Sequence, residues 1–137
     1  MVKLKYLRYE ELCSLVKLLS TLSMFSHVDC NRVYCVKSVG AKTRAYARIY
    51  GTPLAWIAVG KRPEYLIEVI SERFTHLPPL KKVEVIIHEL LHIPYSFSGG
   101  LRSHGAYTSH GMVESVVREL SSRGLLDEAL SISSRLG

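Results

Sequence analysis

The sequence Val83-Glu84-Val85-Ile86-Ile87-His88-Glu89-Leu90-Leu91-His92 is the most informative part of the chain, because it places a His-Glu-x-x-His motif inside an otherwise apolar run. On an α-helix, side chains four residues apart leave the same face, so His88 and His92 can bind one metal ion together. Glu89 is rotated by roughly 100° from His88, which leaves it close enough to reach a metal-bound water. Two imidazoles and a carboxylate that takes a proton from such a water form the arrangement of a zinc hydrolase. The motif therefore predicts a metal-binding helix with Glu89 as the general base.

The setting of the motif distinguishes it from a chance match. By composition alone, His-Glu-x-x-His occurs in roughly one chain in several hundred of this length, and the simplest such match is a surface helix. Two imidazoles and a carboxylate that are buried together require a partner, and a metal ion supplies one. Most sides of this helix are predicted to be buried, because the motif is surrounded by the apolar residues Val85, Ile86, Ile87, Leu90, Leu91 and Ile93.

Length and composition limit the fold and the possible partners. The 137 residues suffice for one domain with one core, which we expect to span residues 1–137. The net charge of +6 and a pI near 9.3 favour acidic partners such as nucleic acid or an acidic polypeptide substrate, although a solvated basic surface fits as well. No apolar run reaches membrane-spanning length, and the first residues lack the pattern of a secretory signal. We therefore expect a soluble, cytoplasmic protein without a membrane partner.

The three cysteines, Cys13, Cys30 and Cys35, indicate free thiols rather than a disulfide framework. Their number is odd, and they form no Cys-x-x-Cys motif. A pairing of Cys30 with Cys35 across a turn is one alternative, and a second metal site with His27 is another. Free buried cysteine is common in proteins, so neither alternative is preferred.

The pattern along the chain predicts an α+β fold, with a helix, two or three strands, the motif helix and then more helix. Residues 33–39 and 65–70 are short and β-branched, which is typical of strands, and residues 45–50 can form another. Residues 54–59 are a short apolar piece that we interpret as a strand or a packed loop. Two prolines open the motif helix, and a third ends it. The predicted helices cover residues 9–25, residues 80 to 92 or 93, residues 109 to 124, and residues 125–136.

A third metal ligand should follow the motif, because a catalytic zinc site usually has three protein ligands and one open position. His104 follows a Gly-Gly loop that can turn the chain back, and Gly105 lets the backbone approach closely. His110 and Glu114 lie four residues apart on the next helix, so both could face the metal. His104 is the preferred candidate, and His110 and Glu114 are the alternatives.

The positions of four more residues near the motif suggest a role or an environment for each. Tyr107 and Tyr95 are candidates to donate a hydrogen bond to the oxyanion that forms during hydrolysis. Arg102 either orients a substrate carboxylate or is simply solvated. Glu84 lies one turn before His88 and is predicted to be an exposed helix position.

The motif, the loop and His104-Gly105 together resemble the SprT-like zinc metallopeptidases, and the wider stretch resembles small archaeal and viral metallopeptidases more closely. The likeness is carried by residues 88–94, residues 97–102 and His104, and it spans roughly residues 33–108. It implies a minimal zincin-like fold, in which a small mixed β-sheet packs on the motif helix between N- and C-terminal helices. The edge strand of that sheet would hold an extended polypeptide substrate.

The same resemblance implies the ligand set and a possible partner. One Zn²⁺ per chain would be held by His88, His92 and His104, with Glu89 as the base. SprT-like proteins act near DNA, so nucleic-acid association is weakly implied, although the zinc-ribbon tail of some members is missing here. Compact minimal gluzincins offer a competing pattern, in which a glutamate on the following helix is the third ligand, as Glu114 would be.

The alternative function is a non-catalytic module, either a basic, metal-stabilised nucleic-acid-binding domain or an interaction protein that keeps a decayed zincin site. Tyr46 and Tyr50 interleave with basic residues, and such interleaving can stack and charge-pair with a nucleic acid strand. An exposed strand face with ordinary charges is the simpler interpretation. Both non-catalytic alternatives predict that Glu89 is dispensable. The basic residues available for nucleic acid are Lys42, Arg44, Arg48, Lys61 and Arg62.

Overall fold

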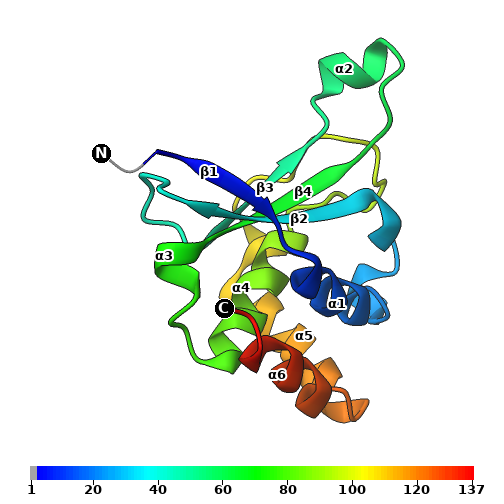
Figure 1. Cartoon of the computed structure of the whole chain (residues 1–137). Coiled ribbons are helices and arrows are strands. Elements are labelled where there is room, and N and C mark those ends of the chain that lie inside the picture. The colour runs from blue at the N-terminus through cyan, green and yellow to red at the C-terminus, as the bar shows by residue number, and fades with distance from the viewer. Residues whose placement is uncertain (1–2) are drawn as a thin grey trace.

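The computed structural model describes residues 3–137 and has an α+β fold, in which helices pack on one face of a four-stranded mixed sheet (Figure 1). The strand order is β1-β2-β4-β3. β2 and β4 are parallel, whereas β1 pairs with β2 and β3 pairs with β4 in antiparallel fashion. The strands are β1 Lys5–Arg8, β2 Val33–Val39, β3 Ala47–Gly51 and β4 Tyr65–Ile70. This architecture is compatible with the small zincin-like fold that the sequence predicts.

Helices α1 and α4 lie against one face of the sheet, and α5 and α6 pack beneath them, while α2 stands off the body on the connection between β3 and β4 (Figure 1). None of the helices described for residues 3–137 is long and apolar enough to cross a membrane. The helices are α1 Glu10–Leu19, α2 Leu54–Ala58, α3 Ser71–Phe74, α4 Pro79–Leu90, α5 His110–Ser122 and α6 Leu126–Ser134, with short 3₁₀ turns at Ser23–Phe25, Cys30–Arg32 and Ala106–Thr108.

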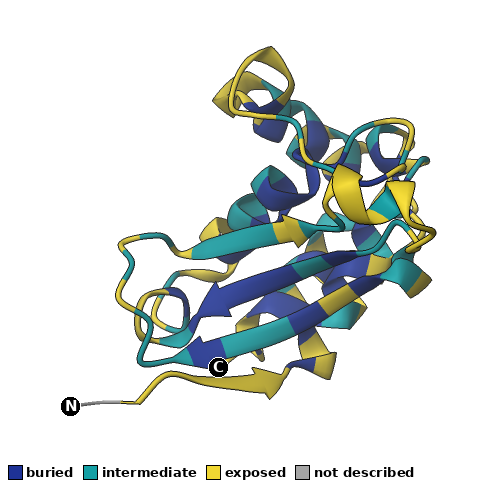
Figure 2. Cartoon of the chain, turned by 90° about the horizontal axis from the view of Figure 1, so that it is seen from above, coloured by how far each residue is buried: buried dark blue, intermediate teal, exposed yellow. Residues whose placement is uncertain are grey.

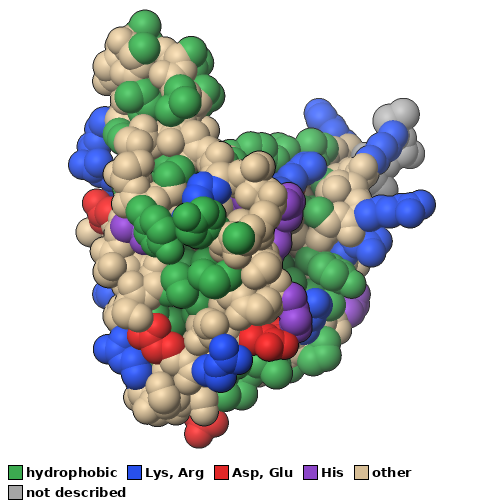
Figure 3. Space-filling view, turned by 180° about the vertical axis from the view of Figure 1, so that it is seen from behind, with side chains coloured by type: hydrophobic (Ala, Val, Ile, Leu, Met, Phe, Trp, Pro, Cys, Tyr) green, Lys and Arg blue, Asp and Glu red, His purple; other side chains and the backbone are tan. Residues whose placement is uncertain are grey.

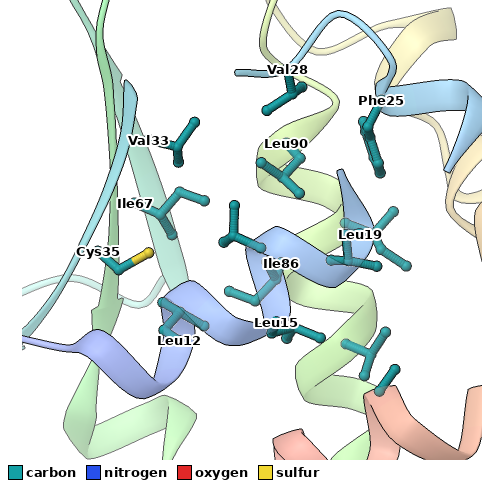
Figure 4. Packing of buried hydrophobic residues seen from close by; sticks show 14 of the residues in the cluster. Leu12, Leu15, Leu19, Phe25, Val28, Val33, Cys35, Ile67, Ile86 and Leu90 are labelled. Carbon is teal, nitrogen blue, oxygen red and sulfur yellow. The ribbon is translucent and has the colours of Figure 1, made fainter. Parts of the chain in front are cut away.

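The motif helix α4 fills the centre of the core. Its side chains Val83, Ile86, Ile87 and Leu90 have no solvent-exposed surface. Each buried side chain of this size stabilises the fold by about 1.5–3 kcal/mol relative to an exposed one. α1 and the sheet supply the facing side chains, and Figure 4 shows Leu12, Leu15, Leu19, Cys35 and Ile67 among them. The nearly continuous apolar run in the sequence therefore reflects a helix that is enclosed on several sides.

Several boundaries differ from the prediction. The first helix ends at Leu19 rather than at residue 25, and Leu22 and Phe25 are instead buried through a 3₁₀ turn. The hydroxyl of Thr21 donates to the carbonyl of Leu18 at 2.7 Å, which favours the end of the helix there. Strands β2 and β4 have the predicted bounds, whereas β3 begins two residues later than predicted. The Asp29 side chain accepts a hydrogen bond from the Asn31 N–H and so caps the short 3₁₀ turn at Cys30–Arg32.

The interpretation of residues 54–59 as a strand or a packed loop is wrong. Leu54–Ala58 forms the helix α2, and its Leu54 and Trp56 side chains are exposed, as is Val59 just beyond it. The helix begins directly after Pro53, whose fixed φ favours a helical start. All three cysteines are free thiols, and Cys35 is buried in the core.

A buried carboxylate joins the two strands nearest the motif helix. Glu68 on β4 has no exposed surface, and it accepts hydrogen bonds from Arg48 Nε at 2.8 Å, Arg48 Nη2 at 3.2 Å and the Tyr50 hydroxyl at 2.6 Å. Burial alone would raise the pKa of Glu68, but the hydrogen bonds from Arg48 and Tyr50 outweigh it and hold the pKa below its usual value. Arg48 and Glu68 are register partners, so this ion pair fastens β3 to β4.

We expect Arg48→Ala to lower the free energy of unfolding by about 3 kcal/mol, because it leaves a buried carboxylate without its cation. This value is at the low end of the usual cost of removing one partner from a buried ion pair. The Arg48 side chain is 38% exposed, so water can partly replace the guanidinium. The pKa of Glu68 is lower in the folded than in the unfolded chain, so the stabilisation is complete above the unfolded-state pKa. It is lost as the pH falls through the folded-state pKa.

Urea unfolding at about pH 7 and about pH 2 measures this effect, and the difference between wild type and Arg48→Ala should be large only at the higher pH. Arg44→Ala, at an exposed position of the preceding loop, is the matched control. Equal urea midpoints for wild type and Arg48→Ala at pH 7 would contradict the assigned role.

Candidate metal centre

The end of α4 positions the motif side chains. His88 and Glu89 lie in its last turn, whereas His92 follows the C-cap residue Leu91. The backbone N–H of His92 donates to the carbonyl of Glu89 at 3.1 Å, so the chain tightens into a 3₁₀ turn as it leaves the helix. The rings of His88 and His92 nevertheless stay together, with centroids 5.1 Å apart. The predicted extent of this helix, to residue 92 or 93, is therefore two or three residues too long as regular α-helix.

A loop of residues 95–103 returns the chain to this pair. Gly99 and Gly100 have φ values of 95° and 69°, which favour glycine, and a Cβ at Gly99 would lie 2.9 Å from the carbonyl oxygen of Thr52. The N–H of Gly99 donates to the Tyr65 hydroxyl at 3.0 Å, and the N–H of Gly100 donates to the Thr52 carbonyl at 2.9 Å. The Gly-Gly turn predicted from the sequence thus fastens the loop to the sheet.

The loop brings His104 to the pair. His104 Nε2 lies 3.2 Å from His88 Nε2, and the His104 ring centroid lies 4.6 Å from that of His92. One ligand nitrogen from each of the three residues lies within 4.8 Å of the other two. Two nitrogens bound to one tetrahedral zinc at 2.0–2.1 Å would be about 3.3 Å apart, so the spacing of His88 and His104 fits a shared ion. This cluster is able to hold a metal ion.

The protonation of the rings also suits a metal. His92 Nδ1 lies 2.6 Å from the carbonyl oxygen of Arg102, and because a carbonyl only accepts, Nδ1 carries the hydrogen and Nε2 keeps a free lone pair. Metal-binding histidines are commonly oriented in this way. Burial, followed by the neighbouring rings of His92 and His104, lowers the pKa of His88 and keeps it neutral. Neutral imidazole is the form that binds a metal.

Glu89 lies beside the histidines and is nearly buried, with 7% of its surface exposed. Burial raises the pKa of Glu89 to about 7. A carboxyl group with such a pKa exchanges a proton readily near neutral pH, which is what general-base catalysis requires. The predicted general base therefore lies in an environment suited to that role.

The three histidines border a cleft that follows β3, the edge strand. A cavity of about 580 Å³ opens beside His88, and another of about 360 Å³ opens beside His92. Arg48, Glu89 and His104 line both cavities. Within residues 3–137, β3 has no strand partner on this side, so its backbone is open to a further strand. The prediction that Glu84 is an exposed position is wrong, since Glu84 is half-buried and lines the larger cavity.

The alternative ligands lie apart from the cluster. His110 Nε2 is 2.8 Å from a carboxylate oxygen of Glu114, and both side chains are largely exposed at the start of α5. His110 lines the larger cavity, but neither residue joins the three converging histidines. The structure therefore groups His104, and not His110 or Glu114, with the motif.

Arg102 borders the smaller cavity, and its side chain holds the loop in place. Its Nε and Nη2 donate to the Leu91 carbonyl at 3.2 and 2.8 Å, which caps the end of the motif helix. The guanidinium lies between two aromatic rings, 4.5 Å from the centroid of Tyr95 and 4.7 Å from that of Tyr107. The Tyr95 hydroxyl points to Met24 Sδ at 3.9 Å. The sequence does not predict that Arg102 also orients His92. The Arg102 group that does so is its backbone carbonyl, which no side-chain pattern reveals.

We expect His104→Ala to weaken zinc binding by more than about 100-fold, because it removes one of three converging nitrogens, whereas outer-shell changes cost 10–100-fold. His110→Ala and Glu114→Ala are the matched controls and should bind zinc as the wild type does. Isothermal titration of the metal-free proteins with Zn²⁺ measures the difference. Retention of wild-type affinity by His104→Ala, with loss in either control, would assign the third ligand to α5.

Arg102→Ala should weaken zinc binding about tenfold, because the loop that presents the Arg102 carbonyl to His92 loses its attachment to the helix end. Arg102→Lys should recover only part of the affinity, since an ammonium group cannot stack between two rings as a guanidinium does. The same titration measures both variants. Equal affinity of wild type and Arg102→Ala would show that the loop is held without this side chain.

Comparison with known proteins agrees with this geometry. A protein family described as "Putative phage metallopeptidase" matches residues 4–127. No curated protein and no solved structure matches the chain. Membership of a metallopeptidase family implies a metal ion, and the cluster of His88, His92 and His104 is where this chain could hold it. The family match covers most of the chain, and the protein therefore belongs to this phage metallopeptidase family.

Proposed function

We propose that this protein is a zinc-dependent metallopeptidase that hydrolyses peptide bonds in polypeptide substrates, with Glu89 as the general base. The observation that carries the proposal is the convergence of three histidine nitrogens within 4.8 Å, beside a nearly buried carboxylate. Imidazole ligands suit zinc among several metals, and three protein ligands leave the fourth position open for chemistry. The family match supports peptidase chemistry in general terms.

The chain supplies three groups for this reaction. The backbone of β3 would bind the substrate as an added strand along the cleft. The Arg102 carbonyl holds His92 in the tautomer that directs Nε2 to the site. A zinc ion bound by the histidines would lower the pKa of water and polarise the substrate carbonyl. The Glu89 carboxylate would then accept the proton of the attacking water and return it to the leaving amine.

Tyr107 and Tyr95 are weaker candidates for oxyanion donors than the sequence alone indicated, because both rings stack on Arg102. We place the enzyme in the cytoplasm, as the sequence predicts, and its three free cysteines suit a reducing compartment.

We expect Glu89→Gln to retain zinc and to lose proteolytic activity by about 10²–10⁴-fold, because the amide cannot accept a proton. Cleavage of casein by the zinc-loaded protein, with zinc content measured in parallel, is the test. Glu128→Gln, at an exposed position of α6, is the matched control and should cleave normally.

The outcome separates the proposal from the non-catalytic alternatives. A Glu89→Gln variant that binds zinc and cleaves at the wild-type rate would exclude Glu89 as the base. A wild-type protein that binds zinc but cleaves nothing would favour a non-catalytic module.

A further inference from the structure

A further cavity opens where the first strand leaves the sheet. β1 pairs with β2 only as far as Arg8 and Val36, so within residues 3–137 the first half of β2 has no strand partner on that side. Figure 2 shows β1, exposed along its length, at this edge of the sheet. The chain turns there into α1, and a cavity of about 520 Å³ remains between β2, α1 and the 3₁₀ turn at Cys30–Arg32.

All three cysteines of the sequence line this cavity, which we call the thiol cavity. Cys13 lies on α1, Cys30 lies in the 3₁₀ turn, and Cys35 lies on β2. Cys35 is buried in the core, whereas Cys13 and Cys30 are half-buried. Apolar packing accounts for one buried cysteine, but it does not require three thiols from three elements around one cavity.

Two of the thiols are neighbours. The N–H of Tyr9 donates to the Cys35 carbonyl at 3.0 Å, which places Cys35 beside the start of α1. Cys13 lies one turn after Tyr9, and helical side chains tilt toward the N-terminus, so the Cys13 thiol is directed back toward Cys35. Figure 4 shows the Cys35 side chain directed from β2 toward the helices. The two thiols are hydrogen-bonded to each other.

This hydrogen bond gives the two thiols different reactivity. It lowers the pKa of Cys13 and outweighs burial, which acts in the opposite direction. The same hydrogen bond, followed by burial, raises the pKa of Cys35. Of the charged neighbours, Glu10 raises the pKa of Cys13 and Arg8 lowers it. Cys13 is therefore the thiol that ionises more readily, and the thiolate is the form that reacts with oxidants.

We propose that Cys13 is an oxidisable thiol that forms a reversible disulfide with Cys35, with a hydroperoxide as the oxidant. With hydrogen peroxide, the Cys13 thiolate attacks one oxygen and becomes a sulfenic acid, while the O–O bond breaks and the departing hydroxide takes a proton to form water. The Cys35 sulfur then attacks the Cys13 sulfur, and its proton leaves with the sulfenic hydroxyl as a second water. The two thiols together lose two electrons, which the peroxide gains.

The disulfide would fasten α1 to β2. α1 packs against the motif helix α4 and against α6 as well as against β2, so the crosslink would tie one cover of the core to the sheet. It would also close a loop between residues 13 and 35, which restricts the unfolded chain. We therefore expect the oxidised protein to resist unfolding better than the reduced protein. A dithiol reductant would reverse the crosslink by thiol–disulfide exchange.

The thiol cavity and the metal centre are separate. Of the residues that the structure describes, none lines both the thiol cavity and a cavity beside the three histidines. Figure 3 shows histidine side chains on the face seen from behind, whereas α1 lies on the near side in Figure 1. Disulfide formation is therefore independent of the proposed peptidase reaction, and each can fail without the other.

Thiol titration and peptide mapping of the full chain test the proposal. Reduced wild-type protein has three free thiols, and two of them should be lost after treatment with stoichiometric hydrogen peroxide. The intact mass should fall by that of two hydrogen atoms. The proteolytic peptides that contain Cys13 and Cys35 should be joined, and dithiothreitol should separate them. This measurement needs no substitution, so it does not depend on whether a variant folds.

Two variants identify the thiols that react. Cys13→Ser should keep both of its remaining thiols after the same treatment, because Cys35 has lost its partner. Cys30→Ser is the matched control, since Cys30 lines the same cavity, and this variant should lose both of its remaining thiols. Oxidation should raise the melting temperature of the wild type by roughly 5–10 °C, and it should leave that of Cys13→Ser unchanged.

Three results would overturn the proposal. The first is peroxide-treated wild-type protein that keeps all three thiols. The second is a disulfide that joins Cys30 to either of the other cysteines, or that joins two chains. The third is oxidation of Cys13 to a sulfinic acid without a crosslink, because Cys35 would then be out of reach of the Cys13 sulfur.

Discussion

The metal centre depends on one constraint, which is that a single helix both fills the core and carries the motif. Val83, Ile86, Ile87 and Leu90 are enclosed on one side of α4, and this burial fixes the rotation of the helix about its axis. Glu89 is thereby held at the border of the cleft. Catalytic groups need placement within about 0.5 Å, and a helix locked by core packing supplies it better than a loop does.

The third histidine depends on backbone groups more than on side chains. His104 follows a loop that is fastened near its middle and near its end. The Gly100 N–H donates to the Thr52 carbonyl near its middle, and the Arg102 N–H donates to the His92 carbonyl at 2.7 Å near its end. The Arg102 side chain adds its own bonds to the end of α4. Because the loop is attached to the same helix that presents His92, the ligand nitrogens move together and not independently.

The parts of the fold that could be predicted are those in which the local pattern and the buried environment agree. β2, β4 and the motif helix bury apolar side chains at the expected spacing, and His104 is signalled by the Gly-Gly turn before it. β1 was missed because all four of its residues are exposed and only pairing with β2 makes it a strand. The α2 segment was misjudged because its apolar composition indicates burial, whereas it projects from the body. The structures of β1 and α2 both depend on how distant parts of the chain pack, which a single sequence does not display.

The pairing of β3 with β4 also protects the chemistry of the site. Arg48 borders both cavities that contain Glu89, and a guanidinium within about 4–6 Å of a carboxylate lowers its pKa by 1–3 units. Such a shift would make Glu89 a poor base. Burial raises the pKa of Glu89 to about 7, whereas the Arg48 guanidinium is hydrogen-bonded to the Glu68 carboxylate. The buried Glu68 carboxylate on β4 thus pairs with the one guanidinium among residues 3–137 that borders both cavities beside Glu89.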